Sequence, residues 1–176
     1  MSLRSLFIPC ALSLLILSSC QSQSEHEIKM AEVILSPKSG SKVEGKVTFY
    51  EHGDGVRIVA HVEGLTPGKH GFHIHEHGDC SAADGATAGG HFNPTSMPHG
   101  SPDDPQHHAG DLGNLEANAQ GVAEYEAVNP WIDLNGPFSI VGKSIVVHQD
   151  EDDLTSQPAG NSGARIGCGT IVERAP

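Results

Sequence analysis

The chain has 176 residues, with 10 lysines and arginines against 22 aspartates and glutamates, so its formal net charge at pH 7 is −12. This acidic balance excludes nucleic acid as an expected partner, because binding to phosphates depends on basic side chains. The length suits one domain with a sizeable core.

Residues 1–19 are predicted to be a secretory signal. Arg4 precedes an apolar stretch at 6–17, which is shorter than the about 20 residues of a membrane span. The small residues before Cys20 resemble the bacterial lipobox, whose cysteine becomes the lipidated N-terminus. With Gln21 after it, we expect an exported, periplasmic protein that is lipid-anchored to the outer membrane. An ordinary cleavage site with a chance cysteine is the alternative.

Residues 20–30 are predicted to be a polar tether, and residues 31–176 the single domain. Without the signal, 9 basic residues face 22 acidic ones, a formal charge of −13. If Cys20 carries lipid, Cys80 and Cys168 are the one pair left for a disulfide, which export favours. Two free buried thiols are the alternative.

The domain is expected to be all-β. Strands are predicted at 30–35, 42–50, 56–62, 70–75, 121–128, 143–148 and 163–172, where residues alternate or are β-branched between turns. No stretch has convincing helical periodicity. Two long segments, 76–120 and 149–162, lack a strand pattern, and the first needs metal ligation or a disulfide to order it. The pattern predicts an antiparallel Greek-key barrel or sandwich of about eight strands with two long functional loops.

The histidines carry the chemistry. His73 and His75 lie two residues apart on a predicted strand, so both side chains point to one face and can approach one metal ion. With them, the chain has the pattern of two metal sites that share one ligand. The further candidate ligands are His91, His99, His108, His148 and Asp111.

In these segments the chain closely resembles copper/zinc superoxide dismutase. The resemblance rests on five motifs in family order and spans residues 33–172: HGFHIHE (70–76), GHFNP (90–94), HAGDLGN (108–114), VVH (146–148) and GARIGC (163–168). It implies dismutation of superoxide to dioxygen and hydrogen peroxide. Copper would change oxidation state and zinc would organise the site.

The resemblance also implies the ligands of each ion. Copper would be held by His73, His75, His91 and His148, and zinc by His91, His99, His108 and Asp111. His91 would bridge the two ions and deliver a proton to the departing peroxide. His107, next to His108, is the alternative zinc ligand.

Two further roles follow from family position. Arg165 would meet the superoxide anion beside copper, with a surface arginine as the alternative. Asp152 would link His73 to His99, with a solvated acidic loop as the alternative.

Among the remaining histidines, His70 is expected to be hydrogen-bonded within the barrel, and His77 is expected to lie beyond the end of its strand. The others, His26, His52, His61 and His107, are expected on the surface.

The cation pattern departs from that of some relatives. No lysine or arginine occurs in 70–142 or 149–164. We therefore expect anion attraction from the copper site, from Arg165 and from cations that the fold brings near, such as Lys69 or Lys143. Activity should depend less on ionic strength than in relatives with lysines in the second loop.

An alternative function is a copper- and zinc-binding envelope lipoprotein without turnover. A purely structural β-sandwich has no reason to carry seven ligands in family order. The oligomeric state stays open between a monomer and a homodimer, because no apolar stripe decides it.

Overall fold

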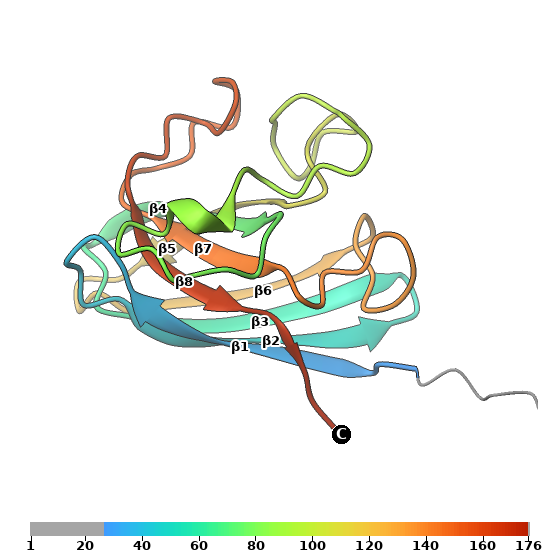
Figure 1. Ribbon diagram of the computed structural model, residues 1–176. Coiled ribbons are helices and arrows are strands. Elements are labelled where there is room, and N and C mark those ends of the chain that lie inside the picture. Colours follow the sequence, from blue (N-terminus) through green and yellow to red (C-terminus); the bar gives the residue numbers. More distant parts are fainter. Residues whose placement is uncertain (1–26, 176) are drawn as a thin grey trace, which may run out of the picture.

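Alternating apolar residues build nine antiparallel strands in the computed structural model, which describes residues 27–175 (Figure 1). The strands are β1 Met30–Pro37, β2 Glu44–His52, β3 Gly55–Glu63, β4 Gly68–His75, β5 Asp111–Ala117, β6 Ala123–Asn129, β7 Ser144–His148, β8 Arg165–Thr170 and β9 Val172–Glu173. The predicted signal, Cys20 and His26 lie outside the described residues. No helix of the described part is long and apolar enough to span a membrane.

The strands form one nearly closed barrel in the order β5-β4-β7-β8-β1-β2-β3-β6, and β9 pairs with β1. The Tyr125 hydroxyl of β6 donates a hydrogen bond to the Leu112 carbonyl of β5 over 3.2 Å, so the two ends of the sheet meet. The chain passes from β3 to β4, which lies beside β5 at the other end of the sheet, and from β6 to β7 in the interior of the sheet. These crossings confirm the predicted all-β Greek-key barrel.

Burial differs between the two sides of the barrel. In β3, buried Val56, Ile58, Ala60 and Val62 alternate with more exposed residues, as in a sheet with one face in water. In β7 and in β4 from His70 onward every residue is buried, because the two long loops, 76–110 and 149–164, rise over this side (Figure 1). We call them the first loop and the second loop. Side chains on the outer face here are enclosed.

β5 was missed in the sequence. It begins with a charged residue, and Gly113 has a φ of +77°, which breaks the extended alternation that strand prediction depends on. The first predicted loop therefore ends earlier than expected, at residue 110. The disulfide between Cys80 and Cys168 confirms the predicted pairing and joins the first loop to β8, so the alternative of two free thiols is wrong.

Candidate metal centre

Strands β4 and β7 carry three of the candidate ligands. His73 and His75 project from the outer face of β4, and His148 ends β7, which is paired with β4. The register shifts between Gly71 and His73 against β5, and between Val147 and His148 against β8. Such irregularities re-aim side chains next to functional sites. The two of them fall at candidate ligands.

The first loop returns to the same edge of the barrel. His91 forms an isolated antiparallel bridge with His75, and the amide of Phe92 donates to the Ile74 carbonyl at 2.8 Å. Asp111, the first residue of β5, pairs with His73. Main-chain hydrogen bonds therefore bring these ligands from separate parts of the sequence onto one surface.

Two groups of potential ligands result. The first group is His73, His75, His91 and His148, and the second group is His91, His99, His108 and Asp111. In each group the ligand atoms lie within 4.8 Å of one another and every residue is buried. These are the residues of the two predicted ligand sets. His91 belongs to both.

Hydrogen bonds fix which nitrogen of each ring is free in the first group. The Nδ1 atoms of His75 and His148 donate to the carbonyls of Gly89 (2.9 Å) and Gly163 (3.2 Å). A carbonyl only accepts, so in the neutral rings Nδ1 carries the proton and each Nε2 atom presents a lone pair. They face each other at 3.4 Å. Two facing lone pairs repel, and a cation between them removes the repulsion.

Burial keeps these rings neutral. It lowers the pKa of His73, and it lowers the pKa of His75 and His148 well below the usual value. Burial also lowers the pKa of His91 to about 4, although the hydrogen bond with Asp111 opposes it. Near neutral pH the lone pairs of the first group are therefore available to a metal ion.

Two buried ring nitrogens among these ligands, His73 Nδ1 and His91 Nε2, have no hydrogen-bond partner, and a third, His99 Nδ1, lies 3.1 Å from Asp111 Oδ1 without hydrogen-bond geometry. An unsatisfied buried polar group costs about 1–3 kcal/mol. In His91 the partnered Nδ1 lies 2.7 Å from Asp111 Oδ1, so the unpartnered Nε2 is on the opposite edge of the ring. Metal ions in both groups would satisfy all three nitrogens.

The second group contains a permanent negative charge. Burial raises the pKa of Asp111, but hydrogen bonds from His108 and His91 hold it far below its usual range. His99 is buried, yet the carboxylates of Asp111 and Asp152 raise the pKa of its ring to about 9. Three imidazoles and one carboxylate are a donor set that suits a closed tetrahedral zinc site, and four imidazoles suit copper. The residues present therefore fit both ions.

The Asp152 carboxylate contacts one histidine of each group. Its Oδ2 accepts from His73 Nε2 at 2.7 Å, and its Oδ1 accepts from His99 Nε2 at 2.9 Å. These bonds leave the Nδ1 atom of each ring for a metal ion. The Asp152 main-chain amide donates to Asn114 Oδ1 at 2.8 Å, and Asn114 Nδ2 donates to the Asp152 carbonyl at 3.0 Å. Asp152 is buried, so it is not a solvated loop carboxylate.

Arg165 lies beside the first group. Its guanidinium donates to the carbonyls of Gly85 (2.7 Å) and Gly89 (2.6 Å), and Gly89 is also the acceptor for His75. It lines a pocket of about 540 Å³ together with His75, His91 and His148. Among the described residues that line this pocket, Arg165 is the one lysine or arginine.

The two lysines expected near the site are engaged elsewhere. Lys69 pairs with Glu151 at 2.9 Å, and the Lys143 ammonium lies 4.3 Å from the centre of the Phe92 ring. Neither lines the pocket.

The other histidines have structural roles or lie on the surface. His70 is buried, with its ring nitrogens 2.9 Å from the carbonyls of His148 and Thr66, as expected. His52, His61 and His77 are exposed.

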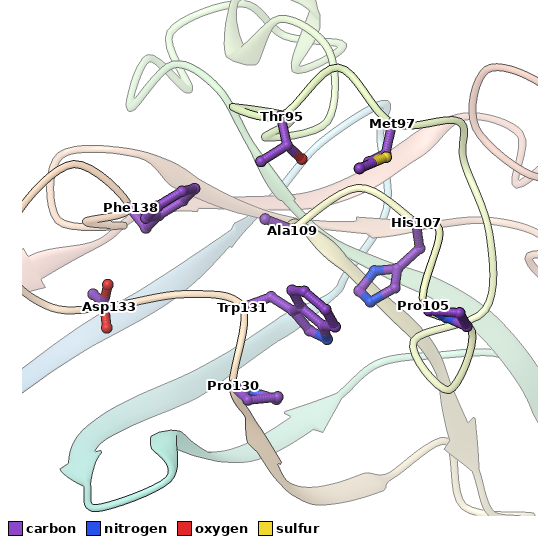
Figure 2. Close-up of a pocket in the computed structure, with 9 residues that line it drawn as sticks. All are labelled: Thr95, Met97, Pro105, His107, Ala109, Pro130, Trp131, Asp133 and Phe138. Atoms are coloured by element: carbon purple, nitrogen blue, oxygen red, sulfur yellow. The ribbon is translucent and has the colours of Figure 1, made fainter.

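The prediction that His107 is a surface residue is wrong. It is buried, belongs to neither ligand group, and donates to the His108 carbonyl at 2.6 Å. Its ring packs edge-on against Trp131 at 5.6 Å, in a separate pocket of about 310 Å³ that Met97 and Phe138 also line (Figure 2). Its polar surroundings in the sequence gave no signal of this burial.

Two comparisons with known proteins agree with this geometry. Residues 43–171 match the family model described as copper/zinc superoxide dismutase (SODC). A solved structure described as a crystal structure analysis of the clock protein EA4 is 35% identical, with a TM-score of 0.78, and the match covers 85% of this chain and 97% of that one. All residues of both ligand groups fall within the family match.

The Asp152→Asn substitution tests the carboxylate behind the ligands. An amide cannot accept from both rings, so we expect the zinc affinity of the copper-free protein to fall by about 10–100-fold. Competition with a chromophoric chelator measures it. Glu151→Gln is the matched control, because that neighbouring carboxylate faces Lys69 instead. Equal zinc affinities in the two variants would contradict the assigned role.

Proposed function

Because the chain belongs to the copper/zinc superoxide dismutase family, we propose that it dismutes superoxide with copper in the first group and zinc in the second. The assignment rests mainly on the position of His91 between the two groups. Its ring belongs to both groups, with Nδ1 beside Asp111 and a buried, unpartnered Nε2 on the other edge. We infer that His91 bridges the two ions.

Bound copper supplies the one-electron chemistry that oxidises one superoxide to dioxygen and reduces a second to peroxide. The chain's own groups bind the anion and handle the protons. Arg165 has five N–H donors, and the carbonyls of Gly85 and Gly89 occupy two of them. The fixed cation in the pocket wall attracts superoxide. His91 Nε2 has no competing partner in the protein, so we assign it as the atom that would take up one proton from solvent and pass it to peroxide, while the second proton would come from solvent directly.

The zinc site has an organising role. The first loop crosses the barrel with little regular structure, and the second group draws three of its four ligands from residues 91–108 of this loop. Zinc has no redox chemistry and favours four fixed ligands. Its binding would hold the loop against β4 and β5 and keep the His91 ring oriented.

The activity of the copper- and zinc-loaded protein tests the proposal. We expect Arg165→Ala to lower the rate constant of superoxide decay by roughly 10–100-fold, because a hydrogen bond to an ion is lost. His148→Ala removes a proposed copper ligand and should nearly abolish the decay.

Arg57→Ala is the control, because that arginine is exposed and pairs with Glu126. Undiminished rates in the Arg165 and His148 variants would sink the mechanism. Metal binding without dismutation by the wild-type protein would instead favour the alternative of a metal-storing lipoprotein.

The pocket electrostatics generate a second prediction. With one cation in the pocket wall and a negative chain around it, we expect only a shallow fall in rate as salt is added. Ala159 lines the pocket, so Ala159→Lys should raise the rate at low salt and steepen its salt dependence. Ala159→Gln adds a side chain without charge and should do neither. A steep salt dependence in the wild-type enzyme would refute this view.

We also propose that the chain is an exported bacterial lipoprotein, anchored at Cys20 to the outer membrane and facing the periplasm. The support comes from residues 1–21, which lie outside the described part. In a Gram-negative host, the full chain should incorporate labelled palmitate and fractionate with membranes. Cys20→Ser should lose both properties, while Cys10→Ser, within the predicted signal, should keep them. Label that persists in Cys20→Ser would disprove the anchor.

A further inference from the structure

Gln157 of the second loop holds the main chain of His99. The His99 amide donates to Gln157 Oε1 at 2.8 Å, and Gln157 Nε2 donates to the His99 carbonyl at 2.8 Å. Within residues 27–175, these are the hydrogen bonds of both main-chain groups of His99. Residues 96–100 form no regular secondary structure. The Gln157 side-chain amide therefore supplies the two main-chain hydrogen bonds that a neighbouring strand would supply to a residue in a sheet.

The second loop holds the His99 ring as well. Asp152 accepts from Nε2 of that ring, so one loop fixes both the main chain and the side chain of this ligand. Gly160 packs directly against the pair, with a φ of +62°, and a Cβ atom there would lie 1.7 Å from Asp152 Oδ1 and 2.8 Å from His99 Nε2. Only glycine permits the loop to close this tightly around His99.

Gln157 also lines the pocket of the first group, with His91, His148 and Arg165. One residue therefore contacts the backbone of a ligand in the second group and forms part of the wall around the first. The contact joins the two loops, because His99 belongs to the first loop and Gln157, 58 residues later, to the second.

We propose that Gln157 is a positioning residue that preorganises His99 for zinc and couples zinc binding to the order of the pocket wall. The inference rests on the proposed zinc assignment of the second group. Without the amide clamp, zinc would have to order an irregular segment as it binds, which lowers its affinity. Such coupling is reciprocal: if the Gln157 hydrogen bonds increase the affinity for zinc, bound zinc stabilises the ordered second loop by the same free energy.

Zinc affinity of the copper-free, disulfide-bonded full chain tests the clamp. We expect Gln157→Ala and Gln157→Met each to weaken zinc binding by about 10-fold, the lower end of what lost partners of metal ligands cause. Methionine keeps the length of the side chain but makes neither hydrogen bond, so it separates bonding from packing. Gln106→Ala, at an exposed glutamine of the first loop, should bind zinc like the wild type.

Amide hydrogen exchange in the zinc-bound protein is the second readout, because a general loss of stability would not single out one amide. The His99 amide should exchange much faster in Gln157→Met than in the wild type or in Gln106→Ala. Residues of β2 and β3, far from the loops, should exchange equally in all three proteins.

The outcomes separate the two proposals. Wild-type zinc affinity and His99 protection in Gln157→Met would overturn the clamp, even if Gln157→Ala is weakened, since packing alone would then explain the effect. A wild-type chain that binds no zinc would overturn the proposed function together with this inference. Zinc binding that is equal in every protein would overturn this inference alone.

Discussion

The burial of ionisable ligands between one face of the barrel and two loops is the constraint on which the structure depends. Apolar packing holds the barrel, but the loops meet over buried imidazoles and carboxylates, and only some of these rings line the pocket. Facing lone pairs on His75 and His148, and unpartnered nitrogens on His73 and His91, destabilise this enclosure unless cations fill it. Metal binding is therefore expected to stabilise the fold as well as to support the chemistry.

The parts of the site that follow a strand period could be predicted from the sequence. His73 and His75 are readable because alternate residues of a strand share a face, and motifs in family order supplied the other ligands. β5 could not be read, because Asp111 and Gly113 interrupt its pattern where the strand begins. The burial of His107 and the role of Gln157 depend on how the loops close, which no local pattern encodes.

The pocket proposed to admit the superoxide anion has a single guanidinium, that of Arg165, among the described residues that line it. Gly89 accepts from both Arg165 and His75, so one carbonyl sets the position of the guanidinium relative to a residue of the first group. The disulfide joins the loop that presents Gly85 and Gly89 to the strand that presents Arg165. Backbone geometry, more than the number of charges, sets the electrostatics of the pocket.

A ring that belongs to both ligand groups also constrains how the gene can change. Mutations that remove His148 or His108 each delete one ligand of one group, and the other group keeps all four of its residues. Mutation of His91 damages both at once, so neither site can be lost gradually through this position. A descendant that loses His91 must find a new donor for each group, whereas one that loses His148 or His108 needs a donor for one group only.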